Sequence, residues 1–426
     1  MHCAEPAPRR GWLALLCASR LLQATIATAY SGVLPFVMAD WHMTAAQAGS
    51  IQSAWHVGYM SSLFAVGLLA DRYGPHRVFV IGSAISATAA LAFALFAHGH
   101  LSAMLLYGLA GLCAGASYTP GLQLLAHNAG PAVRGRAMGL FLGAASMGYA
   151  LSLAAVATFS HAQHWRLGLW VAAGCTLAGA LLTVPALRRM RPAAPSASPG
   201  AMREGVWHAL AETVRDKPAM AGNWAYAFHC WELMALWAWL PAYLVASAGG
   251  TASWQGAGIA LAALAHLASV AGSIAGGAAS DRFGRARIMM AATVASLCMS
   301  FAFGWMWTWP LWLLAAAAAV YNLLAIADSS VYATALADVV APHRLGVAYS
   351  VRSVMGFGAG ALSPWVFGLM LDWGQTRFGF GSTHGWVAAW SSVGLGALLG
   401  PWMIARFARL HRPRQPPIGY SRATRI

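Results

Sequence analysis

The chain has 426 residues, of which 59% are hydrophobic and only 9% are charged, and its formal net charge is +15. Soluble globular proteins carry about a quarter charged residues, so this composition excludes an ordinary soluble domain and indicates a membrane protein. The positive charge does not indicate a nucleic-acid partner, because most basic residues lie in loops on one side of the expected membrane spans. We therefore expect lipids and a small molecule as partners.

Apolar runs of about 20 residues recur along the chain, and each is long enough for a helix to cross the hydrocarbon core of a bilayer. The runs lack apolar–polar alternation, so they predict helices rather than barrel strands. The first run is too long for a signal peptide and contains Arg20, so we expect a transmembrane helix there. The predicted spans are residues 12–37, 44–70, 75–97, 101–126, 137–160, 167–187, 219–247, 254–279, 286–306, 308–335, 346–371 and 384–407.

The basic residues are concentrated in the two tails and in the loops that follow even-numbered spans. The positive-inside rule then places both termini in the cytoplasm. Low lysine with abundant alanine and arginine is typical of bacterial proteins, so we expect a bacterial inner membrane. The expected organisation is an N-terminal six-helix bundle (1–187), a cytoplasmic linker with an amphipathic helix (188–218), a C-terminal six-helix bundle (219–408) and a basic tail near anionic lipids (409–426).

Two short segments separated by a constant offset of 210 residues share one pattern. Each lies between two apolar runs, which predicts a tight charged turn between helices. Repetition of such a turn predicts two homologous halves. The same offset relates Arg134 to Arg344 and His56 to His266. The repeated residues are Gly67, Asp71, Arg72, Gly74 and Arg77 in the first segment and Gly277, Asp281, Arg282, Gly284 and Arg287 in the second, which also contains Arg285.

The Gly-x-x-x-Asp-Arg-x-Gly turn between the second and third predicted helices resembles the signature loop of the major facilitator superfamily. The resemblance covers essentially the whole chain. It implies an all-α membrane fold of twelve helices in two pseudo-symmetric halves, with a central cavity between them. It also implies that Asp71 and Arg72 join a cytoplasmic charge network with the end of the eleventh helix and with Arg134 or Arg136, which latches one of the alternating states.

The chain departs from the family pattern in three places. Pro75 and His76 stand where basic residues are usual, which predicts a weaker latch in the first half. Tyr107 stands where the fourth helix often carries an arginine. The fifth helix lacks the Gly-Pro pair of proton-coupled drug exporters, which lowers the expectation of a typical drug–proton antiporter but leaves export open.

Ionisable residues inside the spans need a partner or a wet cavity, because each costs roughly 2.5–3.5 kcal/mol at the centre of a helix on insertion scales. Arg20 and Glu232 lie at similar depths of equivalent helices, so we expect them to face one another or a shared substrate, with a structural ion pair as the alternative. Asp328 and Arg352 flank a short loop at similar depth, so direct structural pairing and a functional role are equally open for them. Glu232 and Asp328 are also the candidate proton carriers.

Polar residues beside these groups complete the predicted site. Histidine titrates near neutral pH, so symmetric histidines can bind substrate, although a hydrogen-bonded packing role is the alternative. His56 and Met60 share a face that suits soft metals, but no second pair accompanies them, so no metal site is predicted. The predicted substrate-binding residues are Arg20, Gln23, Tyr30, His56, His229 and His266.

These features together predict a secondary active transporter for a small organic anion or amphoteric metabolite. The sequence contains no Walker motif, the usual sign of direct ATP use. A proton or a counter-substrate is therefore the expected driving partner. No catalytic motif and no CxxC spacing among the six cysteines appears, so neither an enzyme nor a cofactor is predicted. A monomer is expected. A drug or siderophore exporter, a copper transporter and a non-transporting membrane sensor remain the alternatives.

Overall fold

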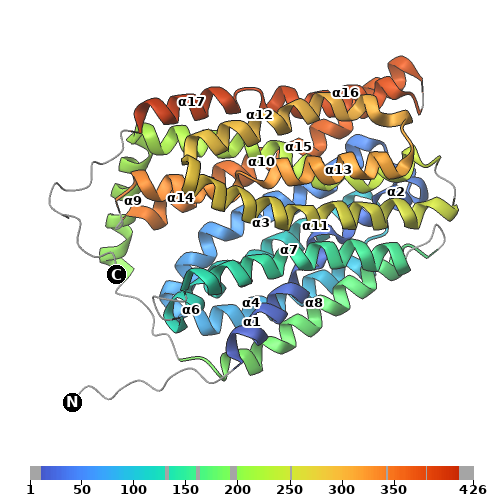
Figure 1. Cartoon of the computed structure of the whole chain (residues 1–426). Coiled ribbons are helices and arrows are strands. Elements are labelled where there is room, and N and C mark those ends of the chain that lie inside the picture. Colours follow the sequence, from blue (N-terminus) through green and yellow to red (C-terminus); the bar gives the residue numbers. More distant parts are fainter. Residues whose placement is uncertain are drawn as a thin grey trace, which may run out of the picture.

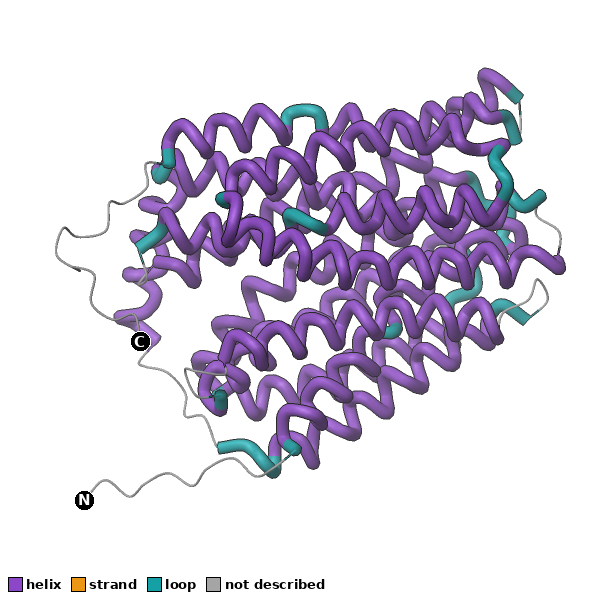
Figure 2. The backbone as a smooth tube through the Cα atoms, in the orientation of Figure 1, coloured by secondary structure: helices purple, strands orange, loops and turns teal. Residues whose placement is uncertain are grey.

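The structure is a computed structural model that describes residues 11–129, 134–159, 164–191, 199–249, 252–341, 344–379 and 381–411. Within these ranges the regular secondary structure is entirely helical. The helices run roughly along one axis and form two groups, which lie close together at the end near α2 and α16 and diverge toward the end near α9 (Figure 2). The expected all-α fold is confirmed.

The first group of helices covers the first six predicted spans. The first and fourth spans are each divided in two by a local irregularity of the helix, whereas the others are single helices. The elements are α1 (Trp12–Ala24), α2 (Ile26–Asp40), α3 (Ala45–Tyr73), α4 (Pro75–Phe96), α5 (His100–Ala114), the short 3-10 helix η1 (Gly115–Ser117), α6 (Tyr118–Asn128), α7 (Arg134–Phe159) and α8 (Arg166–Leu187).

The second group covers the last six predicted spans and is preceded by a helix in the linker. Helix α15 extends seven residues beyond the predicted end of its span at residue 371. The elements are α9 (Pro199–Arg215), α10 (Lys217–Ser247), α11 (Ala252–Phe283), α12 (Arg285–Phe303), the 3-10 helix η2 (Gly304–Thr308), α13 (Leu311–Ile326), α14 (Ser329–Val339), α15 (Leu345–Phe378), α16 (Thr383–Ala397) and α17 (Gly400–Leu410).

Ten helical stretches in the described part of the chain are long and apolar enough to cross a membrane. Helices α3 and α10, at the second and seventh predicted spans, are not among these ten. Both helices supply polar and aromatic side chains to the interior, including Gln52 and His56 of α3 and Glu232 of α10, which are all buried. The count of twelve spans therefore remains a prediction. The two predicted spans outside these ten are the helices that place polar side chains in the protein interior.

The repeated motif forms the same turn in both halves. Gly74 lies between α3 and α4 with φ of 87°, and Gly284 lies between α11 and α12 with φ of 94°. Glycine adopts positive φ values without the steric cost that a Cβ atom imposes. The predicted tight turns between helices are therefore present at both positions, and glycine is required by the backbone conformation.

The two groups pack most closely where α3 of the first half crosses α15 of the second. A Cβ atom added to Gly49 would lie 2.2 Å from the carbonyl oxygen of Pro364, and one added to Gly368 would lie 2.2 Å from that of Ala45. Small residues allow helix backbones to approach in this way inside membranes. The close packing fixes the two halves against each other at this end of the molecule.

Helix α9 lies within the segment predicted to form the linker. The side chains of Trp207 and Val214 are 57% and 53% exposed, so α9 keeps an unpacked apolar side. Arg344 lies 3.6 Å from a carboxylate oxygen of Glu212 and 3.9 Å from one of Asp216, which ties α9 to the start of α15. Helix α1 begins and α17 ends at the same end of the molecule as α9 (Figure 1). The predicted basic tail, residues 409–426, lies outside the described residues from residue 412 onward.

Candidate functional site

A cavity of about 510 Å³ lies between the two halves, and both contribute to its walls. Sites for small molecules commonly measure 300–1,000 Å³, so the cavity is large enough for a metabolite. The polar side chains on its walls are Arg20, Gln23, Thr28, Ser31, Gln52, His56, Tyr59, Ser117, Tyr118, Ser146 and Tyr149 from the first half, and Tyr226, Cys230, Trp237, Ser269, Ser273, Ser329, Ser330 and Arg352 from the second.

Arg20 lies on the cavity wall of the first half and is only 5% exposed. One terminal nitrogen of its guanidinium donates to the hydroxyl of Ser117 at 3.2 Å. The guanidinium carbon lies 5.4 Å from the ring centre of Tyr118 and 5.6 Å from that of Phe141. The Nε donor is buried without a hydrogen-bond partner among the described residues. Arg20 thus has aromatic neighbours and at least one unused donor.

Arg352 has similar surroundings on the wall of the second half. Its guanidinium carbon lies 4.5 Å from the ring centre of Tyr226 and 5.3 Å from that of Tyr349. Its Nε is also buried and unpartnered among the described residues. Within the described part of the chain, neither Arg352 nor Arg20 forms an ion pair, and none of the cavity-lining residues is an aspartate or a glutamate.

The prediction that Arg20 and Glu232 face one another or a shared substrate is wrong for this structure. The carboxylate of Glu232 accepts hydrogen bonds from the hydroxyls of Ser296 at 2.9 Å and Ser300 at 2.8 Å, both on α12, and it does not line the cavity. Sequence position gave the depth of Glu232 but not its direction. At 100° per residue it points about 200° away from Cys230, which does line the cavity.

The predicted direct pair between Asp328 and Arg352 is also wrong. Asp328 Oδ1 lies 2.9 Å from Nδ1 of His229, and Oδ2 accepts a hydrogen bond from Thr293 at 2.8 Å. The ring of His229 packs beside Tyr226, with centroids 5.7 Å apart. Asp328 therefore has a nearer partner on α10. The rings of His229 and Tyr226 form an aromatic layer, and Arg352 lies on its other side. His229, predicted to contact substrate, lies behind the cavity wall rather than on it.

Of the other predicted substrate-binding residues, some lie on the cavity wall and some lie in the protein core. Gln23 and His56 line the cavity, and His56 Nε2 lies 3.3 Å from the side-chain nitrogen of Gln52. His266 does not line it, and its ring packs 4.8 Å from that of Trp237. Tyr30 lies in the hydrophobic core and donates its hydroxyl to a backbone carbonyl oxygen at 3.0 Å. Of the two symmetric histidines, His56 therefore lies on the cavity wall and His266 packs against an aromatic ring away from it.

Sequence reasoning missed much of the aromatic wall. Tyr59, Tyr118, Tyr149 and Tyr226 all line the cavity, and Tyr149 also packs against Trp237 across the two halves at 5.9 Å between centroids. Aromatic residues are common in apolar spans, so their presence gives no signal by itself. The useful signal was position, since Tyr226 precedes the lining residue Cys230 by one helical turn.

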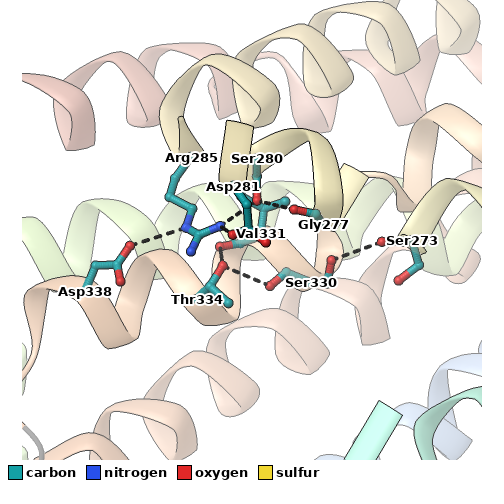
Figure 3. Close-up of polar contacts among 9 residues, drawn as sticks. All are labelled: Ser273, Gly277, Ser280, Asp281, Arg285, Ser330, Val331, Thr334 and Asp338. Carbon is teal, nitrogen blue, oxygen red and sulfur yellow. Dashed lines mark hydrogen bonds and ion pairs between the residues drawn. The ribbon is translucent and has the colours of Figure 1, made fainter. Parts of the chain in front are cut away.

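The second copy of the motif holds a charge network, as Figure 3 shows. Arg285 pairs with the carboxylate of Asp281, lies 3.4 Å from that of Asp338 and donates to the hydroxyl of Ser280 at 2.7 Å. These contacts join α11, α12 and α14 at the end of the bundle that carries the Gly284 turn. A charge network at the motif, which the resemblance implied for the first half, is thus observed in the second.

In the first copy of the motif, most of the corresponding side chains fall outside the described part of the chain. The side chains of Asp71, Arg134 and Arg136, and the surroundings of Gly67, lie outside the described residues. Arg72 is exposed, and its guanidinium carbon lies 5.2 Å from the ring centre of its neighbour Tyr73. The first-half latch therefore remains a prediction.

At the opposite end of the bundle, a carboxylate joins the two halves directly. Asp372 of α15 accepts hydrogen bonds from the backbone nitrogens of Ala45 and Ala46, both at 2.8 Å. These nitrogens belong to the first turn of α3, where backbone N–H groups lack partners within the helix and the helix dipole favours a negative charge. Asp372 thus caps a helix of the other half.

Comparison with known proteins agrees with this architecture. Residues 16–364 match the model of the Major Facilitator Superfamily. A bacterial homologue of the human lysosomal transporter Spinster, in an inward-facing and unoccupied conformation, has a TM-score of 0.74 at 15% identity, covering 96% of this chain and all of that one. A mutant of the nucleoside transporter NupG has a TM-score of 0.76 at 15% identity, covering 94% of this chain and 100% of that chain.

Sequence similarity to curated proteins is narrower. The puromycin resistance protein pur8 of Streptomyces alboniger is 26% identical over 197 residues, which cover 41% of this chain. The match spans only 35% of the length of that relative. The family match, by contrast, covers most of the chain, and the fold agrees with it over nearly its full length. The chain therefore belongs to the major facilitator superfamily and is a membrane transporter rather than an enzyme.

Proposed function

We propose that this transporter carries a small organic anion by alternating access, with Arg20 as its principal anion contact. The observation that supports this proposal is the charge of the cavity wall, where two arginines occur without a carboxylate among the described lining residues. An amphoteric solute fits the same site through its acidic group. A buried guanidinium without a counter-ion is costly, and a bound anion offsets that cost.

The distribution of contacts between the halves supports an arrangement that is closed at the Asp372 end. Among the described residues, the ring contacts of Tyr59 with Phe357 and of Tyr149 with Trp237 lie at the cavity. The hydrogen bonds from the start of α3 to Asp372 lie beyond it. The basic residues place the opposite end in the cytoplasm by the positive-inside rule. The cavity then faces the cytoplasm in this state.

Proton coupling is assigned to the carboxylates behind the cavity wall. Asp328 contacts His229, which packs against Tyr226, and Tyr226 in turn lies under Arg352. Protonation of the Asp328–His229 pair changes the charge next to this aromatic layer and can bias a two-state equilibrium. Glu232 is the second candidate carrier, because it is buried and bonded only to hydroxyls among the described residues.

We extend the proposal to the organisation and location of the protein. The two transport halves are residues 1–187 and 219–408, joined by the linker of residues 188–218, and the tail of residues 409–426 lies near anionic lipids. The protein works as a monomer in a bacterial inner membrane with both termini in the cytoplasm. The cavity between the halves supports a monomeric unit, since both of its walls come from one chain.

A ligand screen on the detergent-purified protein tests the proposed anion site. The melting temperature is measured with organic anions, amphoteric metabolites, neutral sugars, cationic drugs and Cu(I). We expect an anion or amphoteric solute to stabilise the wild type but not Arg20→Gln. The control is Arg406→Gln, because Arg406 also lies near an aromatic ring, that of Trp402, but outside the cavity. Stabilisation by cations alone, unaffected by Arg20→Gln, contradicts the proposal.

Drug export is a second candidate, favoured by the partial similarity to a puromycin resistance protein. The cavity wall separates the two candidates, because Arg20 and Arg352 repel a cationic drug and the described lining residues include no carboxylate. The same screen decides between them through the sign of the charge on the stabilising ligand.

A further inference from the structure

The two arginines on the cavity wall form a matched pair, one from each half. Arg20 of α1 lies beside aromatic rings of α6 and α7, and Arg352 of α15 lies beside a ring of α10 and one of its own helix. In both, the Nε donor is buried and has no hydrogen-bond partner among the described residues. Rings beside a guanidinium stabilise its charge without using its N–H donors. Each arginine therefore keeps donor capacity for a ligand.

The charge balance of the cavity identifies what this ligand must carry. Its described wall holds two arginine charges and no carboxylate. The buried carboxylates behind the wall are engaged elsewhere: Asp328 with His229 and Thr293, and Glu232 with two serine hydroxyls. A monoanion neutralises only one of the arginines. A ligand with two anionic groups neutralises both, and guanidinium groups bind carboxylate and phosphate oxygens with strong, directional hydrogen bonds.

We propose that the transported solute carries two anionic groups, one bound by Arg20 and the other by Arg352. This inference rests on the proposed anion transport and specifies its substrate class as a dicarboxylate or a phosphorylated or phosphono-carboxylate of similar charge. The solute bridges the two halves, since each arginine belongs to a different one. The neutral middle of the solute lies against the uncharged wall, where Gln23, Gln52 and His56 provide polar contacts.

The bridging geometry also explains how such a solute drives the conformational change. A ligand shifts an equilibrium between two states only through its different affinity for each. A dianion that reaches both arginines gains its second contact only in states where the two halves hold them at the right separation. A monoanion gains the same single contact in every state. The second anionic group therefore adds a differential affinity that a monoanion lacks.

The test compares dianions with matched monoanions. The probes are two series, α,ω-dicarboxylates and α,ω-phosphonocarboxylates of increasing length, each with the monomethyl ester that removes one negative charge. Binding to the full-length protein in detergent is measured by titration for wild type, Arg20→Gln, Arg352→Gln and the control Arg406→Gln. We expect one chain length to bind at least about tenfold more tightly than its ester, as the loss of one charged hydrogen-bonded contact predicts.

Each arginine variant is expected to lose that preference. Arg352→Gln should weaken dianion binding about 10- to 100-fold while leaving ester binding nearly unchanged, so that the two ligands become equivalent. Arg352→Lys, which restores the charge, should recover part of the preference and shows that the variant protein still folds. Arg406→Gln should behave as wild type. The melting temperature of each variant without ligand provides the folding control.

The outcomes separate this inference from the function on which it rests. A dianion preference that persists in Arg352→Gln overturns the inference, as does the failure of every dianion to bind better than its ester. If monoanions still bind in those cases and lose affinity in Arg20→Gln, anion transport stands. If the only ligands are neutral or cationic and are insensitive to Arg20→Gln, both proposals fail.

Discussion

Arg20 and Arg352 show how neighbours decide the role of an ionisable residue in a membrane. Both have aromatic rings beside the guanidinium, whereas behind the wall Asp328 contacts His229 and Thr293, and Glu232 accepts hydrogen bonds from two serines. The sequence predicted that Arg20 and Glu232 would face one another or a shared substrate, and that Asp328 could pair with Arg352. Because a sequence gives depth along a helix but not rotation about it, neither pairing is found among the described residues. It singled out these residues but not their contacts. The actual partner of Asp328, His229, lay within the predicted set.

The ring of Tyr226 provides a direct test of the surroundings of Arg352. Tyr226→Leu removes the ring that holds the guanidinium of Arg352 in place, so we expect ligand affinity to fall by at most about 2- to 30-fold, the equivalent of a whole cation–π contact of about 0.5–2 kcal/mol. Tyr226→Phe keeps the ring and should retain most of the affinity. Titration with the best-binding anion measures both. Equal losses in the two variants would show that the hydroxyl, not the ring, matters.

The contact between Asp328 and His229 predicts a separable defect in coupling. Asp328→Asn cannot change its charge with pH, so accumulation driven by a proton gradient should be lost, whereas exchange of substrate across the membrane should continue. Proteoliposomes with and without a pH gradient measure the two activities. Glu232→Gln is the matched comparison, since it neutralises the other buried carboxylate. Normal gradient-driven accumulation by Asp328→Asn would remove Asp328 from the coupling mechanism.

At the scale of elements, hydrophobic patterning predicted where helices occur, and the repeated motif predicted the turns at Gly74 and Gly284. These features depend on local composition, so they can be read from a single sequence. The contact of α3 with α15 and the capping of α3 by Asp372 could not, because they join residues more than 300 positions apart. The cavity wall could be predicted only in part, since it combines faces of helices from both halves.

The two motif glycines should tolerate alanine poorly. In Gly74→Ala or Gly284→Ala a Cβ atom enters a conformation with positive φ and extended ψ, which costs roughly 1–3 kcal/mol. We expect a lower melting temperature for each variant. Gly174→Ala in α8 is the control, because no atom lies within 4 Å of the added Cβ and alanine favours helices. Unchanged stability of both motif variants would contradict the assignment of strain to these turns.

At the scale of the whole molecule, the protein consists of two helical groups held together at one end and carrying a charged cavity between them. Asp372 is a polar connection between the groups at the end where they lie close together. The Arg285 network, which Figure 3 shows in close-up, lies within one group at the opposite end. Alternating access requires contacts between the two groups, such as that of Asp372, to break while each group stays intact. The strength of the Asp372 contact should therefore set the balance between states.

Loss of the Asp372 charge should favour opening at that end. Asp372→Asn keeps one acceptor oxygen but loses the second acceptor and the attraction to the helix dipole. Spin labels at Leu101 and Arg377, in a background without cysteines, should report longer distances in this variant. The control is Asp40→Asn, because Asp40 accepts a hydrogen bond from Trp165 within one half. Identical distance distributions for Asp372→Asn and wild type would show that this contact does not hold the end closed.

The most direct test of the account is uptake into proteoliposomes of the anion that most stabilises the purified protein. Wild type and Arg20→Gln are reconstituted in parallel, with Arg406→Gln as the control for reconstitution. The account predicts saturable uptake by wild type and Arg406→Gln, stimulated by a proton gradient, and none above background by folded Arg20→Gln. Equal uptake by Arg20→Gln and wild type, or uptake confined to cationic solutes, would contradict it.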